Sequence, residues 1–294
     1  MWKLLKIELF KIFKKPRTYI AFAAIAAIVL LIQLALYADG ESYIQIGLSA
    51  LSQAGIEING KILNGYLVCF VILQLLLIHV PLLIALVAGD LIAGEANMGT
   101  LRLLITKPPS RTQLLLSKFF ASLIYTMSLL LFMSVLALGL SLLVFGPGDL
   151  LVQKSETVIL IQNMKQVVLE DGTKIFTNDI LWRYFAAFGF AAVAMATVAS
   201  LAFFLSIFAD NSIGPIVATM SIVILFTILL TMDIPLFNAI KPYLFINHML
   251  NWKGFFEDPV DYKEILKSLT ILLTHIVLFV SAAIFIFKKK DILS

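Results

Sequence analysis

Six charged side chains lie close together in one stretch of the chain, and side chains of these types can bind charged groups on another molecule. They lie within residues 89–118 and comprise Asp90, Glu95, Arg102, Lys107, Arg111 and Lys118. Carboxylates and cations at such short intervals can form ion pairs with a partner protein. The alternative is that the cations only fix the orientation of a membrane protein. What this stretch can do therefore depends on the elements that hold it.

The rest of the chain is apolar enough to cross a lipid bilayer several times. Of its 294 residues, 61% are hydrophobic and only 14% are charged, and the mean hydropathy is +1.01. A soluble domain cannot bury so much apolar side chain, whereas about 20 apolar residues span the hydrocarbon of a bilayer. We predict an all-α integral membrane fold with six transmembrane helices, near residues 18–37, 66–88, 119–145, 181–208, 213–232 and 269–287.

The distribution of basic residues predicts which ends of these helices face the cytoplasm. With both termini inside, the inner segments hold thirteen basic and five acidic residues, a net charge of +8. The outer segments hold nine basic and thirteen acidic residues, a net charge of −4. Lys and Arg near the ends of spans stay on the cytoplasmic side. We therefore expect both termini to be cytoplasmic, and we attribute the pI near 9.0 to topology, with no nucleic-acid partner.

Residues 1–17 precede the first span and show helical periodicity. The apolar residues fall on one side of such a helix, namely Trp2, Leu5, Leu9, Ile12 and Phe13. The lysines fall towards the other side, namely Lys3, Lys6, Lys11 and Lys14. This pattern predicts an amphipathic helix in the membrane interface, which Pro16 ends. An ordinary basic flank of the first span is the alternative.

Local signals within the charged stretch predict short ordered pieces rather than a loose loop. Glycines interrupt the end of the second span, and Gly99 marks a turn. Ser110 followed by Gln113 forms a capping box that starts the third span. We expect a short helix at 100–105, parallel to the membrane, that presents Arg102 to the cytoplasm where a soluble partner can bind it.

These residues resemble the cytoplasmic segment of permease subunits of ABC-2 type transporters. In that family an acidic residue precedes Gly-Thr, and a Ser-Arg precedes a Gly-Lys. Here Glu95-Ala-Asn-Met-Gly-Thr-Leu-Arg-Leu-Leu is followed by Pro109-Ser110-Arg111 and by Lys118, with Ser117 in place of the usual glycine. The resemblance extends over the chain, from the amphipathic start to the basic-Asp ending after Phe287.

The resemblance implies a single ABC-2 type transmembrane domain over residues 1–294, in the cytoplasmic membrane of a bacterium. Its first cytoplasmic loop, 89–118, would be a coupling segment that docks on an ATP-binding subunit. A second permease protomer, identical or related, would complete the assembly in membrane lipid. Gly99 and Pro109 would shape the loop while its charged residues pair with the partner. The implied docking positions are Glu95, Gly99, Thr100, Arg102, Pro109, Ser110 and Arg111.

Three further features have both a functional and a plain structural interpretation. The second cytoplasmic turn presents Asp210 and Asn211, either as another contact with a partner or as a helix cap. His79 and His275 lie inside spans and are candidates for the transport pathway. A His bonded to a carbonyl of its own helix is the alternative for each.

The chain contains no G-x-x-x-x-G-K-[ST] motif for binding the phosphates of a nucleotide. We expect no catalytic residue, cofactor or metal site in this chain, which would therefore not be an enzyme. ATP and Mg²⁺ would bind to a partner subunit. The predicted function is a permease subunit, an exporter, that couples ATP hydrolysis by that partner to movement of a cargo. The alternatives are a non-transporting membrane scaffold or sensory subunit and a membrane-embedded hydrolase or transferase.

Two long segments, 146–180 and 233–268, face the outside in this topology. In the first, Asp171-Gly172 between β-prone runs predicts a hairpin. The second is aromatic, and the resemblance implies short helices that dip into the outer leaflet. No repeat or linker divides the chain, so we expect one domain.

Overall fold

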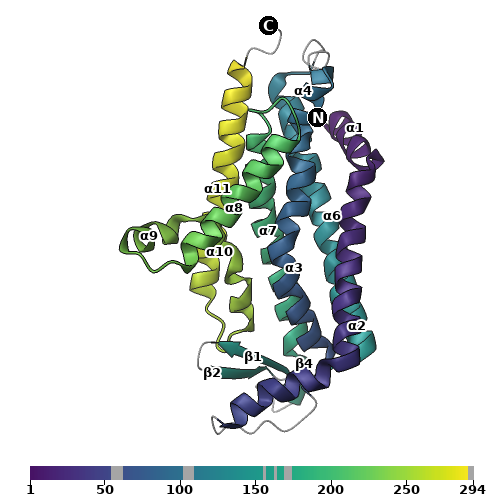
Figure 1. The fold of residues 1–294 in the computed structure, drawn as a ribbon, viewed down its shortest axis with the longest axis vertical. Helices are drawn as coiled ribbons and strands as arrows, with labels where there is room; N and C mark the ends of the chain where they lie inside the picture. Colours follow the sequence, from purple (N-terminus) through teal and green to yellow (C-terminus); the bar gives the residue numbers. More distant parts are fainter. Residues whose placement is uncertain (54–61, 102–108, 155–156, 162–163, 169–173, 291–294) are drawn as a thin grey trace.

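The computed structural model describes the chain except for residues 54–61, 102–108, 155–156, 162–163, 169–173 and 291–294. Six helices in the described part are long and apolar enough to cross a membrane. They run along an elongated bundle, as is typical of a multi-pass membrane protein (Figure 1). The first residues of the chain and the last described ones lie at the same end of this bundle, which we call the termini end. Short strands lie at the opposite end, the strand end.

The six spanning helices match the six predicted spans, although the fourth and fifth helices end earlier than predicted, at Leu205 and Thr231. They are α2 (Pro16–Gln53), α3 (Gly65–Ala88), α6 (Arg111–Phe145), α7 (Asp179–Leu205), α8 (Ile213–Thr231) and α11 (Tyr262–Lys289). The α2 helix continues beyond the predicted span and its last part runs across the strand end. The α11 helix also begins earlier than predicted, because Asp261 caps it by accepting hydrogen bonds from the N–H groups of Lys263 and Glu264.

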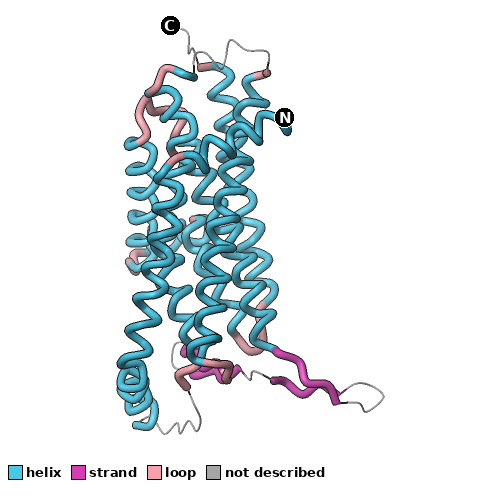
Figure 2. Tube along the Cα trace, turned by 90° about the vertical axis from the view of Figure 1, so that its right-hand side faces the viewer, coloured by secondary structure: helices cyan, strands magenta, loops and turns pink. Residues whose placement is uncertain are grey.

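The core of the bundle is built around α3 and α7. In the most hydropathic part of each helix, the buried share of residues is 56% for α3 and 67% for α7. The same share is only 11% for α11 and 22% for α2. The latter two helices therefore expose most of their apolar surface, which in a bilayer faces lipid. Figure 2 shows long helices side by side between the two ends of the bundle.

The α1 helix (Trp2–Lys14) is a separate element at the termini end, packed against α6. It ends because Pro16 disfavours a helical conformation of the preceding residue, and Lys15 is extended with φ −83° and ψ 132°. The α2 helix then begins without an intervening loop.

The predicted apolar side of α1 is only partly right. Leu5 and Ile12 are buried, and Leu9 and Phe13 pack half-buried against the same core. Trp2, by contrast, is 65% exposed. Protein rather than lipid therefore covers the apolar stripe, because sequence periodicity shows which residues share a side but not what lies against that side.

The charged stretch begins with α4 (Asp90–Asn97), which follows α3 after Gly89 alone. The sequence predicted an interruption, but Gly89 has a right-handed helical conformation (φ −67°, ψ −21°) and the chain stays nearly continuous. The predicted helix at 100–105 lies outside the described residues apart from Thr100 and Leu101, which are helical.

Two antiparallel hairpins form the strand end. Strand β1 (Leu150–Lys154) pairs with β2 (Thr157–Ile161), and β3 (Met164–Val168) pairs with β4 (Lys174–Asn178). The second pairing confirms the predicted hairpin, although its turn at residues 171 and 172 lies outside the described part. The all-α prediction holds for the spanning bundle and not for this segment.

Four short helices connect α8 to α11 beside the middle of the bundle (Figure 1). They are α9 (Pro235–Ile240), η1 (Lys241–Tyr243), α10 (Phe245–Met249) and η2 (Leu250–Phe256). The guanidinium of the buried Arg183 in α7 fixes the end of η2. Its Nη1 donates to the carbonyls of Phe255 and Glu257 at 2.9 and 2.8 Å, while Nη2 lies 2.9 Å from Asp179 Oδ2.

Candidate docking site at the termini end

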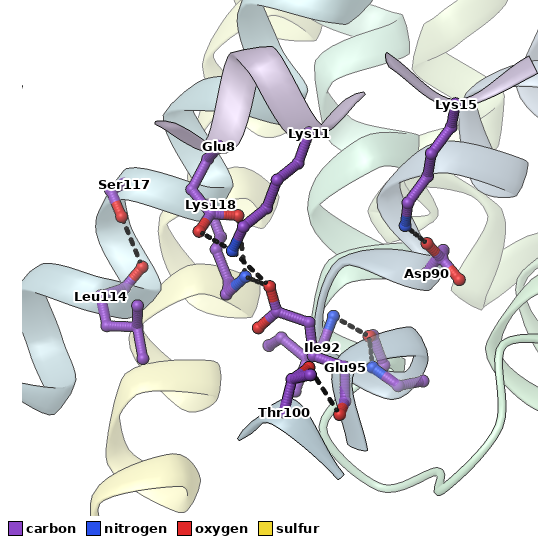
Figure 3. A network of polar contacts seen from close by, with 12 residues as sticks. Glu8, Lys11, Lys15, Asp90, Ile92, Glu95, Thr100, Leu114, Ser117 and Lys118 are labelled. Carbon is purple, nitrogen blue, oxygen red and sulfur yellow. Dashed lines mark hydrogen bonds and ion pairs between the residues drawn. The ribbon is translucent and has the colours of Figure 1, made fainter. Parts of the chain in front are cut away.

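Charged side chains from α1, from its junction with α2, from α4 and from α6 meet at the termini end (Figure 3). We call this group the termini-end cluster, and its members are Glu8, Lys11, Lys15, Arg17, Asp90, Glu95 and Lys118. Four of them, Glu8, Asp90, Glu95 and Lys118, are buried. Charges are rarely buried unless they are paired. The cluster joins the start of the chain to both ends of the docking segment, the name used below for residues 89–118.

Four of these residues form a closed set of ion pairs. Lys118 Nζ lies 2.8 Å from Glu8 Oε2 and 2.7 Å from Glu95 Oε1. Lys11 Nζ lies 2.8 Å from Glu8 Oε1 and 2.8 Å from Glu95 Oε1. Two carboxylates thus share two ammonium groups, and the set is electrically neutral. Lys118 is only 1% exposed, so its charge depends on these two acids for compensation.

The electrostatics of Glu8 and Lys11 agree with this pairing. Burial opposes ionisation of Glu8, but the charges of Lys118 and Lys11 and their hydrogen bonds outweigh burial and hold its pKa below the ordinary 4.5. Burial also opposes protonation of Lys11, yet hydrogen bonds to Glu8 and Glu95 raise its pKa above the ordinary 10.5. Both groups therefore remain charged at neutral pH.

A second part of the cluster is built around Asp90, the first residue of α4. Its carboxylate pairs with Arg17 and lies 2.7 Å from Lys15 Nζ, both of which flank the start of α2. The hydroxyl of Ser212 donates to the same carboxylate. Asp90 thereby connects the docking segment to the first span and to the turn between α7 and α8.

The hydroxyl of Ser206 makes another connection to that turn. It accepts hydrogen bonds from the backbone N–H groups of Ile92 and Ala93 at 3.1 and 2.9 Å. These N–H groups lie in the first turn of α4, where donors lack partners within the helix. The start of the docking segment, α4, is therefore connected to the second turn at the termini end.

The predicted docking positions near residue 99 form an exposed tip beside α4. Gly99 and Thr100 are exposed, and Gly99 has φ +67°, a conformation that favours glycine. The Thr100 hydroxyl donates to the carbonyl of Glu95 at 3.3 Å. Ser110 is exposed and completes the predicted capping box with Gln113.

Pro109 and Arg102 are two further predicted docking positions. Pro109 is half-buried just before the capping box. Arg102 lies outside the described residues, so its predicted contact with a partner stays a prediction.

Two other docking positions, Glu95 and Arg111, already have partners within the chain, and their contact with another protein stays a prediction. Glu95 is 6% exposed, and its carboxylate pairs with Lys11 and Lys118 in the closed set of ion pairs. Arg111 Nη1 donates to the carbonyls of Lys288 and Lys290 at 3.2 and 3.0 Å. Both residues thus help to hold this surface in place.

The remaining predicted residues are also placed by the structure. Asp210 and Asn211 are exposed, and Asn211 Oδ1 accepts from the N–H of Gly214 at 3.0 Å, as in the cap interpretation. His79 Nδ1 lies 2.7 Å from the carbonyl of Leu75, and His275 Nδ1 lies 2.9 Å from that of Ile271. Each histidine is thus hydrogen-bonded within its own helix, which is the plainer of the two interpretations.

Sequence reasoning missed Glu8, Lys11, Lys118, Ser206 and Ser212 as parts of one site. A signal for Glu8 was present, because it lies three residues after Leu5 and four before Ile12, on the stripe that is buried. An acid within an apolar stripe indicates a buried partner of opposite charge. No comparable signal identified the two serines, whose contacts depend on the packing of helices far apart in the sequence.

Two cavities elsewhere in the described part differ in character. An apolar groove of about 580 Å³ lies between α6 and α7, with Ser134 among otherwise apolar lining residues and glycines. A cavity of about 460 Å³ between α3, η2 and α11 has a mixed lining that includes Phe70, Gln74 and Lys253. Among the described residues, no group of three or more His, Cys, Asp or Glu side chains is placed to hold a metal ion.

The fold defines a multi-pass helical membrane protein with a charged, internally paired site at one end. The chain matches the family described as "Protein of unknown function (DUF2705)" over residues 26–293, and it belongs to that family. It is also similar to the "Uncharacterized protein YhcI" of Bacillus subtilis (strain 168), with 28% identity over 213 residues. That match covers 70% of this chain, and the chain spans 63% of the length of this relative.

Proposed function

We propose that this protein is the membrane-spanning permease subunit of an ATP-binding cassette exporter in a bacterial cytoplasmic membrane. A separate ATP-binding subunit, with ATP and Mg²⁺, docks on the segment 89–118 at the cytoplasmic side. Two permease protomers, copies or relatives, enclose the path of the cargo. This chain contributes no catalytic residue of its own, and both of its termini are cytoplasmic.

The observation that carries this proposal is the combination of an exposed tip with a firmly held base. The tip at Gly99 and Thr100 is open to a partner, whereas the base is held by Glu95, Lys11 and Lys118. A segment that transmits the motion of a partner must not yield at its attachment. Buried ion pairs that join three helices provide such an attachment.

The position of the segment also supports the proposal. It lies at the end where both termini and the second turn gather (Figure 1), which is the end richest in basic residues. Basic residues next to spans indicate the cytoplasmic side, where ATP is available. The resemblance to ABC-2 type permeases over the same residues points to the same partner.

Purification of the full chain from its native membrane in mild detergent tests the proposal. We expect a stoichiometric protein that contains the phosphate-binding motif, with ATPase activity that depends on the complex. Arg102→Glu should abolish this association while the spanning bundle stays folded. Lys263→Glu, an exposed change near the start of α11, is the matched control and should retain it.

A non-transporting scaffold or sensory subunit is the second candidate, because it would use the same tip and base to recruit a partner. The two candidates differ in the dependence of ATP turnover on cargo. Association with an ATP-binding protein without any cargo-stimulated turnover would favour the second. Purification without a nucleotide-binding partner would contradict the permease function.

A further inference from the structure

The outward side of α1 is a surface that neither the bundle nor the docking segment uses. Its exposed side chains are Trp2, Lys3, Lys6, Ile7, Phe10 and Lys14. In an α-helix of 3.6 residues per turn these six fall within an arc of about 140°. The open face of α1, as we call this set, thus consists of three large apolar side chains and three lysines.

Apolar and basic side chains are interleaved on the open face. Lys6 Nζ lies 5.5 Å from the centroid of the Trp2 ring, and Lys14 Nζ lies 5.7 Å from that of Phe10. Such contacts place each ammonium group beside an apolar ring. The one acid of the helix, Glu8, is buried on the other side, so every charge on the open face is positive.

The position of α1 in the chain indicates what covers this face. The first span, α2, follows α1 directly at Pro16, so α1 lies at the height where the chain enters the bilayer. At this height aromatic rings insert below the headgroups, and long lysine side chains reach the phosphates. We propose that the open face of α1 binds the anionic lipid headgroups of the adjoining leaflet, with Trp2, Ile7 and Phe10 inserted beneath them.

Lipid bound here would act on the docking site through the opposite side of the same helix. Glu8 and Lys11 hold Glu95 and Lys118, so the headgroup layer fixes the helix to which the docking segment is attached. The inference rests on the membrane placement made under the proposed function. It does not require an ATP-binding partner, and its test uses this chain alone.

Tryptophan quenching in reconstituted bilayers tests the proposal. The full chain is placed in phosphatidylcholine with a fixed fraction of phosphatidylglycerol, and bromine is carried by the acyl chains of one lipid or the other. The difference between the parent protein and Trp2→Phe isolates the signal of Trp2. The attraction of each lysine to an anionic leaflet is worth roughly a fivefold factor in binding. We expect brominated phosphatidylglycerol to quench Trp2 several-fold more per mole fraction than brominated phosphatidylcholine.

Substitution of the three lysines decides whether charge causes the preference. Lys3→Gln, Lys6→Gln and Lys14→Gln together should remove it, whereas Lys263→Gln with Lys267→Gln, exposed at the start of α11, should leave it unchanged. Equal quenching by both lipids in the parent protein would overturn the proposal. Absence of quenching by either lipid would also overturn it, since protein, such as a second copy, would then cover the face.

Discussion

Replacement of Lys118 by Met should release α1 from the bundle. The substitution keeps an apolar stem of similar length but removes the ammonium group that lies 2.8 Å from Glu8 and 2.7 Å from Glu95. Lys11 alone would then face two buried carboxylates. Removing one partner of a buried ion pair costs about 3–5 kcal/mol. Because the cluster lies at one end of the bundle, we expect this loss as local undocking of α1 rather than as global unfolding.

The reactivity of a cysteine at position 12 measures this undocking. Ile12 is 3% exposed, so the thiol in Ile12→Cys is protected while α1 is docked. Cys69 is the one native cysteine and is fully buried, so the parent chain gives a low background. A loss of about 3–5 kcal/mol corresponds to roughly a 150- to 5,000-fold rise in the open population. Maleimide labelling of Ile12→Cys should therefore accelerate at least about 100-fold in Lys118→Met.

Lys267→Met is the matched control for Lys118→Met. Its ammonium group lies 3.9 Å from Glu264 in a pair whose side chains are 58% and 52% exposed. Exposed pairs of this kind contribute little to stability, so the labelling rate should stay within about twofold of the parent value. A rise of less than about threefold in Lys118→Met would refute the conclusion that the closed set of ion pairs holds α1.

Three more predictions concern pH, close packing and a buried cation. The contribution of Glu8 is present above pH 4.5 and is lost as pH falls through its lowered pKa. That of Lys11 is present below pH 10.5 and is lost as pH rises through its raised pKa. Burial lowers the pKa of Lys15 in the same cluster below 10.5, so we expect the population of undocked α1, measured by hydrogen exchange, to stay constant only from about pH 5 to 8. A transition near neutrality would contradict this. Gly65→Ala places a Cβ 2.6 Å from a backbone carbonyl of α6 and should cost about 1–3 kcal/mol in mixed-micelle unfolding. Gly139→Ala, with nothing within 4 Å, is its control, and equal costs would refute the packing argument. Arg183→Met removes the guanidinium that pairs with Asp179 and donates to the carbonyls of Phe255 and Glu257, and it should cost about 2–5 kcal/mol in the same assay; a cost under about 1 kcal/mol would count against it.

The spanning bundle could be predicted from the sequence because its signals are local. Long apolar runs identified all six helices, and the Ser110 and Gln113 pattern located the start of α6. The antiparallel pairing of β3 with β4 also followed from β-prone runs around a turn. Each of these features depends on neighbours in the sequence, so no knowledge of packing was needed.

The candidate site could be predicted only in part, because its contacts join distant segments. The sequence placed Glu95 and Arg111 in a charged stretch but could not show that Lys118 and the carbonyl of Lys290 already engage them. It also assigned the apolar stripe of α1 to lipid, whereas α6 covers that stripe and leaves Trp2 exposed. In both cases the residue types were informative, and the identity of the covering element was missing.

Photo-cross-linking from the exposed tip tests the central claim most directly. A photoreactive amino acid at position 100, where Thr100 is exposed, is activated in native membranes, and cross-linked proteins are identified by mass spectrometry. Position 243, where Tyr243 is 74% exposed beside the middle of the bundle, is the control. The permease function predicts a cross-link from position 100, but not from 243, to a protein that carries the phosphate-binding motif. Cross-links from position 100 to other proteins, with no nucleotide-binding protein among those identified, would contradict the permease function.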